Sequence, residues 1–234
     1  MAIGGKIVRM SSALDNIFWN CLSGPHANFA TGVDHIRRYG PGFSPIIGSR
    51  DAEHPDFEAI APFCAPGESI YIDVWSGAAP RGWEIEKEAR MFKMIWDAPA
   101  PDADAAPDAV LLKPEHASQA LELAQLTNPG PFGIRTPELG DFFGYFEDGR
   151  LIAMAGERTE APGLREVSGI CTHPEFQGRG LARKLTLKLV RRHIQRGMRT
   201  YLHVMGHNTN ARQLYAKMGF RDHLETTVRV IKRK

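Results

Sequence analysis

The chain has 234 residues, enough for one large domain or two small ones, and 43% of them are hydrophobic while 24% are charged. This balance is typical of a folded globular protein and excludes a disordered chain or a fibrous repeat. No apolar stretch approaches the ~18 residues of a membrane-spanning helix, and the first residues lack the apolar core of a secretory signal. We therefore expect a cytoplasmic protein without a membrane partner.

Charge is distributed unevenly along the chain. Residues 177–234 contain 15 Lys and Arg against two acidic residues, a net charge of +13, and because the whole chain carries +2, the first 176 residues carry −11. A basic segment of this kind indicates an anionic partner. That partner is a phosphate-rich cofactor, nucleic acid or the acidic remainder of the same chain.

The cysteine and histidine patterns do not indicate a metal site. Cys21, Cys64 and Cys171 are odd in number, widely spaced and without a C-x-x-C pair, so we expect buried free thiols. His203 and His207 have a four-residue spacing but straddle a predicted strand end, so their side chains would not share a face. No metal is expected.

Residues 97–108, with the sequence DAPAPDADAAPD, contain only Asp, Ala and Pro. This composition cannot pack a core and disfavours the interior of helices and strands, so it predicts a linker. We expect an N-terminal module over residues 1–97, a linker over 98–107 and a C-terminal module over 108–234.

The N-terminal module is predicted to be small, rich in loops and of α+β character. A helix is expected over residues 12–22, with Ser12 as its cap and apolar positions spaced for one buried face. Alternation over 69–75 and an apolar run over 91–96 each predict a strand.

The C-terminal module shows a clearer order of elements. Asp148-Gly149 is a hairpin signal between two of its strands, and Pro114 suits the first turn of a helix. The predicted strands cover 108–112, 144–147, 151–159, 166–172, 200–205 and 226–232, and the predicted helices cover 114–126, 180–196 and 208–218.

A glycine-rich turn connects the strand over 166–172 to the helix over 180–196. A helix N-terminus presents unpaired amides and a partial positive charge, and glycines let the backbone approach a phosphate. Arg179, Arg183 and Lys184 add positive charge, which suits a pyrophosphate. The turn matches neither the G-x-x-x-x-G-K-[ST] loop nor a dinucleotide-binding G-x-G-x-x-G.

This turn resembles the [QR]-x-x-G-x-[GA] signature of the GNAT superfamily of N-acetyltransferases, through Gln177, Gly180 and Ala182. A second family signature is matched by Asn210-Ala211, Leu214-Tyr215 and Gly219-Phe220. The resemblance covers about residues 108–232. It implies a mixed α/β (α+β) fold with a twisted mixed sheet flanked by helices, in which parallel strands over 167–172 and 200–205 splay apart.

The resemblance also implies acetyl-CoA (coenzyme A) as the cofactor. The backbone of Ile170, Cys171 and Thr172 would pair with the pantetheine amides, and Asn210 would hydrogen-bond the same arm. The pyrophosphate would be held by the turn and the start of the helix, that is by Gln177, Gly178, Arg179, Gly180, Leu181, Ala182 and Arg183.

Two catalytic residues follow from the resemblance. Tyr215 would contact the cofactor and protonate the departing thiolate, while a backbone amide near Cys171 or Thr172 would stabilise the oxyanion. Glu166 lies eleven positions before Gln177, an offset resembling that of the family's general base. The simpler interpretations are a packed tyrosine and a surface glutamate; His173, Glu175 and Glu157 are alternative bases.

The resulting hypothesis is an N-acetyltransferase that moves an acetyl group to a primary amine, on a small molecule or a protein. The alternative is a non-catalytic acyl-CoA-binding sensor or scaffold. Nucleic acid is not the expected partner, and a homodimer stays open. The N-terminal module could be a degenerate copy of the same fold, whose Trp19, Tyr39, Trp75 and Trp83 line an acceptor pocket or, more simply, fill its core.

Overall fold

The computed structural model describes residues 13–234, so the predicted cap Ser12 lies outside the described part of the chain. Within that part, eleven strands form one mixed sheet in the order β1-β2-β3-β4-β11-β5-β10-β9-β8-β7-β6. Only the pairs β3–β4 and β9–β10 are parallel. This confirms the expected mixed α/β architecture.

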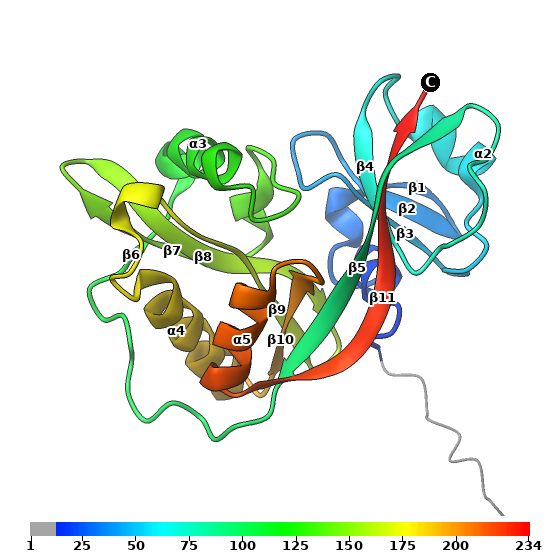
Figure 1. Ribbon diagram of the computed structural model, residues 1–234. Helices are drawn as coiled ribbons and strands as arrows, with labels where there is room; N and C mark the ends of the chain where they lie inside the picture. Colours follow the sequence, from blue (N-terminus) through cyan, green and yellow to red (C-terminus); the bar gives the residue numbers. More distant parts are fainter. Residues whose placement is uncertain (1–12) are drawn as a thin grey trace, which may run out of the picture.

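The strands differ greatly in length. The N-terminal ones are short, namely β1 (Ala30–Val33), β2 (Ile36–Tyr39), β3 (Ile46–Ser49) and β4 (Ser69–Asp73). The two longest, β5 (Trp83–Trp96) and β11 (Phe220–Arg233), pair with each other along almost their whole length and join the two halves of the molecule (Figure 1). The remaining strands are β6 (Val110–Leu111), β7 (Phe142–Glu147), β8 (Arg150–Ala161), β9 (Leu164–Thr172) and β10 (Arg199–Met205).

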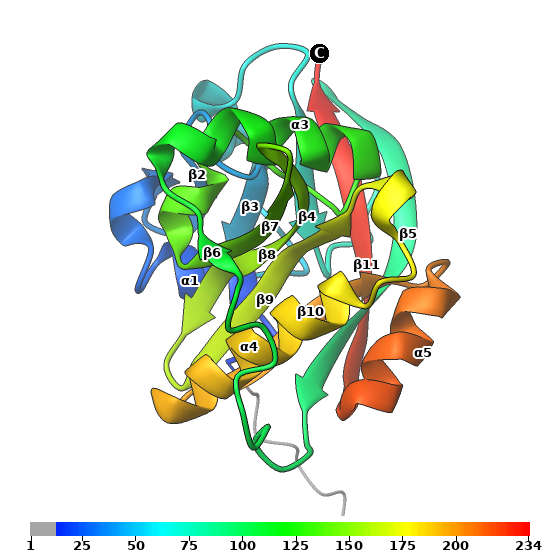
Figure 2. The ribbon, with the colours of Figure 1, turned by 90° about the vertical axis from the view of Figure 1, so that its left-hand side faces the viewer.

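Helices cover both faces of the C-terminal half of the sheet. The α-helices are α1 (Ile17–Leu22), α2 (Phe57–Ile60), α3 (Ala117–Thr127), α4 (Leu181–Gln195) and α5 (Thr209–Met218). α3 lies on one face and α4 and α5 on the other (Figures 1 and 2). Short 3-10 helices occupy Ala27–Phe29, Ala61–Phe63, Pro114–His116, Thr136–Leu139 and Pro174–Phe176.

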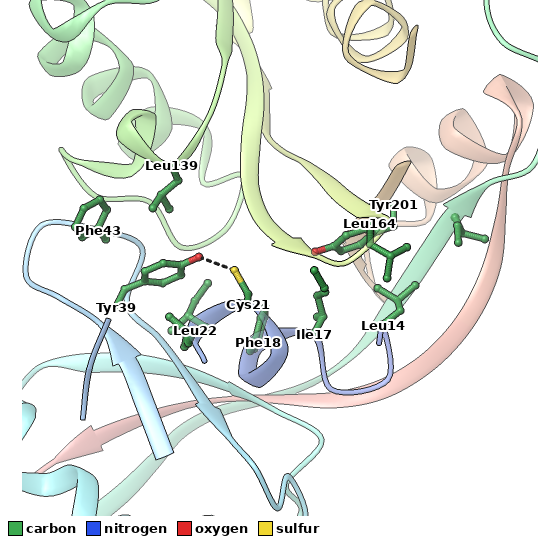
Figure 3. Packing of buried hydrophobic residues seen from close by; sticks show 13 residues of the cluster. Leu14, Ile17, Phe18, Cys21, Leu22, Tyr39, Phe43, Leu139, Leu164 and Tyr201 are labelled. Atoms are coloured by element: carbon green, nitrogen blue, oxygen red, sulfur yellow. Dashed lines mark hydrogen bonds between the residues drawn. The ribbon is translucent and has the colours of Figure 1, made fainter. Parts of the chain in front are cut away.

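α1 packs on the same face as α3, in the angle between the two halves. Its residues Ile17 and Cys21 are fully buried in one cluster with Leu164 of β9 and Tyr201 of β10, and Figure 3 shows their side chains directed from α1 toward those strands. Because each fully buried apolar side chain contributes about 1.5–3 kcal/mol, this cluster fixes α1 beside β9 and β10.

α4 forms where the sequence predicted a helix. Leu185, Leu189 and Val190 are completely buried and share the face that packs on the sheet. Gly180 takes a left-handed conformation with φ of 73° at the N-cap, and no side chain caps the helix. No capping side chain therefore accepts a hydrogen bond from the N-terminal amides of α4.

Most predicted elements of the C-terminal half are confirmed, but the long strands extend beyond their predicted limits. β5 begins at Trp83 rather than residue 91, and in its outer part exposed charged residues alternate with residues that are mostly buried or half-buried. β11 begins at Phe220 rather than residue 226, and a register shift between Asp222 and Leu224 interrupts the alternation of the missed part. The turn at Asp148 and Gly149, both with positive φ, joins β7 to β8 as expected.

The sheet runs across the predicted boundary between the modules. β5 precedes residue 97 in the chain, yet it lies between β10 and β11. Residues 97–109 contain neither helix nor strand, as expected for a linker, but they pack on α4: Lys188 Nζ donates to Asp104 Oδ2 at 2.5 Å, and Ala106 is fully buried. The two-module division stays a prediction.

Tyr39, Trp75 and Trp83 of the N-terminal half fill cores, whereas Trp19 is half-buried and its ring lies under Arg50. Trp75 and Trp83 are buried in a cluster with Ile36 and Ile70, and Tyr39 is buried against α1. Cys21, Cys64 and Cys171 are buried free thiols, as expected. Across residues 13–234, none of the helices has the length and apolar character required to span a membrane.

Candidate active site

β9 and β10 pair over only three positions before they diverge. The parallel register joins Leu164 to Arg199, Arg165 to Thr200 and Glu166 to Tyr201, after which both strands continue without pairing to each other. The resemblance implied this splay, and it is confirmed. We call the unpaired stretch between residues 167–172 of β9 and 202–205 of β10 the opening.

The backbone of β9 has one satisfied edge and one open edge at this point. On the β8 side, Cys171 pairs with Met154 and Thr172 with Ala153. On the other side, no described strand pairs with Ile170, Cys171 or Thr172. Because backbone N–H and C=O groups require partners, this edge can bind the amides of an extended ligand as an added strand would.

The opening leads to the N-terminus of α4. Gly178 and Gly180 have φ of 80° and 73°, and a Cβ built at either position meets nothing within 4 Å. Among the described residues, no hydrogen-bond acceptor is recorded for the amides of residues 178–183. Gln177 differs, because its amide donates to the Pro174 carbonyl at 3.4 Å. The turn thus presents successive free donors and no side chain that blocks access to them.

Cations surround the same turn. Arg179 is held by Glu147, at 3.0 Å between Nη1 and Oε2, and lies over the ring of Phe176. Arg183 and Lys184 are exposed, and no ion pair is recorded for them among residues 13–234. Two cations in the first turn oppose the helix dipole by about 0.3–1 kcal/mol each, a cost that a bound anion would remove.

Much of the remaining positive charge of the C-terminal segment is neutralised within the chain. It pairs with the acidic part through Lys188–Asp104, Arg221–Asp97, Arg229–Glu88 and Lys232–Glu86. One of the three anionic partners predicted from the charge pattern is therefore the chain itself. At the start of α4, Arg183 and Lys184 have no such recorded pairing among the described residues.

Tyr215 of α5 lies beside the opening, on the face of the sheet that α4 and α5 cover. Its side chain is 9% exposed and packs in one cluster with Ile170 and Leu202. Burial raises the pKa of Tyr215 to about 12, with a smaller contribution from Cys171. Its hydroxyl has no recorded hydrogen-bond partner among the described residues. The phenol therefore keeps its proton at neutral pH and can donate it.

Asn210 lies in the first turn of α5, and its side chain is exposed. The cap of this helix is Asn208, whose Oδ1 accepts from the Ala211 amide at 3.2 Å. Because Asn208 performs the capping, the side chain of Asn210 is left to bind other groups.

Glu166 is fully buried on the face that α1 covers. Its carboxylate accepts two hydrogen bonds from Arg158, at 2.6 and 3.1 Å, and one from Thr159 Oγ1 at 2.6 Å. Burial alone would raise the pKa of Glu166, but the charge of Arg158 and the hydrogen bonds from His203 and Arg158 outweigh it and hold the pKa well below its ordinary value. A carboxylate so acidic and so fully bonded is a weak base, which disfavours the direct proton abstraction expected from the sequence.

The alternative bases lie elsewhere. Glu157 bonds His193 near the C-terminal end of α4, away from the turn, and is held by Arg165 at 2.9 Å. His173 is bonded on both ring nitrogens, to the Glu175 amide and to Arg150. The Glu175 side chain is 72% exposed.

His203 of β10 joins the site although sequence reasoning considered it only as a metal ligand. Its Nδ1 lies 2.7 Å from Oε1 of Glu166. The alternation of side chains along β10 could have indicated this position. Leu202 and Val204 pack on the face that α4 and α5 cover, so His203, like Tyr201, lies on the face that α1 covers. Arg158 has no such signal, since its contact with Glu166 depends on the pairing of β8 with β9.

Comparison with known proteins agrees with this geometry. The family model described as FR47-like protein matches residues 142–230. A solved acetyltransferase of the GNAT family from Novosphingobium aromaticivorans DSM 12444 is 34% identical, with 96% of this chain and 100% of that chain covered and a TM-score of 0.86. The chain belongs to the GNAT family. No curated protein matches it.

Two more distant structures share the GNAT fold. A GCN5-related N-acetyltransferase-like protein from Streptococcus suis 89/1591 is 13% identical, with a TM-score of 0.60 over 93% of this chain and 92% of that one. A GCN5-related N-acetyltransferase from Kribbella flavida is 17% identical, with a TM-score of 0.57 over 88% and 90%. Membership of the GNAT family makes this protein an acetyltransferase, and the similarity extends through its N-terminal half.

Proposed function

We propose that this protein transfers an acetyl group from acetyl-CoA to a primary amine by direct attack of the amine on the thioester. The observation that carries the proposal is the junction of two features: the open edge of β9 beyond Glu166 leads directly to the free amides of residues 178–183. An extended arm ending in a pyrophosphate fits such a junction.

The residues of the junction suit acetyl-CoA part by part. The backbone of Ile170, Cys171 and Thr172 would pair with the pantetheine amides, and Asn210 would hold the same arm. The pyrophosphate would accept from the turn amides, with Arg183 and Lys184 neutralising its charge. Gly178 and Gly180 suit this contact because their positive φ values favour glycine and the space around them is open.

Acetyl-CoA supplies an activated carbonyl, and the chain supplies the proton transfers. A β9 amide near Cys171 or Thr172 would stabilise the negative charge that develops on the carbonyl oxygen. As the carbon–sulfur bond breaks, Tyr215 would donate its phenolic proton to the sulfur, and solvent would restore it. The high pKa of Tyr215, about 12, keeps this acid loaded at neutral pH.

The acceptor is a primary amine on a small molecule or a protein, and we place the reaction in the cytoplasm, where three buried free thiols are compatible with the redox state. Nucleic acid is not required to explain the basic segment, since its lysines and arginines largely pair within the chain.

The test combines binding with turnover. Calorimetry with acetyl-CoA is followed by a thiol-release assay against a panel of polyamines, amino acids and lysine peptides. Amine-dependent release of CoA supports the proposal. If acetyl-CoA binds but no amine causes release of CoA, the acyl-CoA sensor is favoured instead. If acetyl-CoA does not bind, both the enzyme and the sensor are excluded.

A further inference from the structure

We infer that His203, held in place by Glu166, is the base that removes the proton from the acceptor amine, an assignment that rests on the proposed N-acetyltransferase function. Glu166 then acts as a positioning residue rather than as the base itself. The proton acceptor then belongs to β10. This strand borders the opening on the side opposite Ile170, Cys171 and Thr172 of β9.

The first observation is an unpartnered nitrogen. The His203 side chain is only 7% exposed, and its Nδ1 is bonded to Glu166 at 2.7 Å. Its Nε2 is buried and has no hydrogen-bond partner among the described residues. A buried polar nitrogen without a partner is disfavoured, and native proteins retain few of them.

The second observation is the position of the ring. Tyr201 is the last residue of β10 that pairs with β9, and His203 is the next residue on the same face. His203 therefore lies just inside the opening on the α1 side, in ring contact with Phe18 and Tyr201. Tyr215 approaches the opening from the α5 side. Acid and base thus act on the two sides of one gap.

The third observation is the fixed charge state of Glu166. Arg158 and Thr159 donate to its carboxylate and keep it ionised, so it accepts a hydrogen bond from His203 Nδ1–H. This leaves the lone pair of the neutral imidazole on Nε2. Ionisable groups around the ring include Glu166 on β9 and Tyr201 on β10, which contact it, and Lys93 on β5, which pairs in register with His203 and forms an ion pair with Asp73 at 2.6 Å.

Proton transfer from the acceptor precedes its attack on the thioester. The acceptor ammonium loses one proton to Nε2 of His203, so one N–H bond breaks and another forms. The electron pair left on the amine attacks the thioester carbon, and the imidazolium is stabilised by the Glu166 carboxylate. The imidazolium returns its proton to solvent after the acetylated product departs.

The experiment compares His203→Asn, Glu166→Gln and the control His54→Gln. Asn places an amide donor near the position of Nδ1 and so preserves the bond to Glu166, but it removes Nε2. His54 is a surface histidine whose side chain is 80% exposed. Thiol release with the best amine of the panel is measured as kcat/KM from pH 6 to 10, alongside acetyl-CoA affinity and thermal unfolding.

We expect His203→Asn to lower kcat/KM at pH 7 by about 10²–10⁴-fold, with acetyl-CoA affinity changed less than about 2-fold. The deficit should shrink at high pH, where the amine deprotonates without help, a dependence that a purely structural role would not produce. Glu166→Gln should give a smaller loss and move the acidic limb of the profile. His54→Gln should match the wild type throughout.

A second readout is independent of turnover. Nitrogen-15 NMR of labelled histidine should show His203 as the Nδ1–H tautomer in the wild type, and Glu166→Gln should alter that signal. A folded, acetyl-CoA-binding His203→Asn variant with kcat/KM within about 3-fold of wild type would remove His203 as the base and leave the proposed function standing. If the wild type binds acetyl-CoA but acetylates no amine, both the proposed function and the assignment of His203 as the base are excluded.

Discussion

Glu166 of β9 and Tyr201 of β10 form the last register pair between these two parallel strands. Beyond this pair the strands separate, and the strand residues that we propose for binding and proton transfer, Ile170, Cys171, Thr172 and His203, lie on its C-terminal side. The buried cluster of α1 packs at the same level through Tyr201 and Leu164 (Figure 3). The N-terminal half of the chain therefore supports the point at which the sheet opens.

Tyr215→Phe should lower kcat by about 10²-fold or less and leave acetyl-CoA affinity nearly unchanged. The substitution removes only the hydroxyl, which has no protein partner to lose, while the ring stays packed against Ile170. Single-turnover thiol release and calorimetry measure the two quantities. The matched control is Tyr145→Phe, which loses a hydrogen bond to Asp108 of 3.1 Å and should keep its activity. Equal activity in both variants would exclude Tyr215 as the acid.

Gly180→Asp should abolish acetyl-CoA binding, because it adds a negative side chain where the pyrophosphate is expected. The backbone strain of a left-handed residue is about 1–2 kcal/mol and must be separated from this effect. Gly163→Asp provides that separation, since Gly163 has the same φ of 73° and the same open surroundings in the β8–β9 turn. Calorimetry should show a loss of at least about 10-fold in affinity for Gly180→Asp and wild-type affinity for Gly163→Asp.

Arg183→Gln combined with Lys184→Gln should weaken acetyl-CoA binding by about 10-fold at low salt, because both cations lie in the first turn of α4 without a recorded internal partner. The difference from wild type should narrow at 1 M salt, where the Debye length falls to ~3 Å. Arg199→Gln combined with Lys217→Gln removes the same charge elsewhere on the surface. If both double variants bind equally weakly, net charge rather than the turn determines affinity.

The parts of the site that the sequence predicted are those set by local chemistry. The turn from Gln177 to Ala182 combines two glycines with the start of an amphipathic helix, so its position and its free amides follow from residues adjacent in the chain. The amphipathic spacing of Leu185 and Leu189 likewise predicts α4 from one segment.

The parts that the sequence did not predict depend on pairing between distant segments. Glu166 meets Arg158 and His203 only because β8, β9 and β10 adopt one particular register. Spacing from Gln177 gave Glu166 as a base, but it could not reveal that the carboxylate is already bonded. The outer half of β5 was missed because Lys87 is exposed on the side that carries Trp83, Ile85 and Ala89, which interrupts the alternation of a half-buried strand.

Glu157→Gln should lower the free energy of unfolding by about 3 kcal/mol at pH 7. Burial alone would raise the pKa of Glu157, but the hydrogen bond from His193 and the charge of Arg165 lower it to about 2. The unfolded chain has an ordinary value near 4.5, so it binds more protons than the folded protein between pH 4.5 and 2. This stabilisation is present above pH 4.5 and is lost as the pH falls toward 2.

Denaturant unfolding at pH 7, 5, 4 and 3 tests whether this stabilisation is lost as the pH falls. The difference between wild type and Glu157→Gln should be constant from pH 7 to 5 and should shrink at pH 4 and 3, because the wild type alone loses stability there. The control Glu138→Gln removes an exposed ion pair with Arg135, in which both side chains are nearly half exposed, and should cost less than about 1 kcal/mol. A difference for Glu157→Gln that stays unchanged down to pH 3 would mean that lost packing, rather than the buried charge, accounts for its effect.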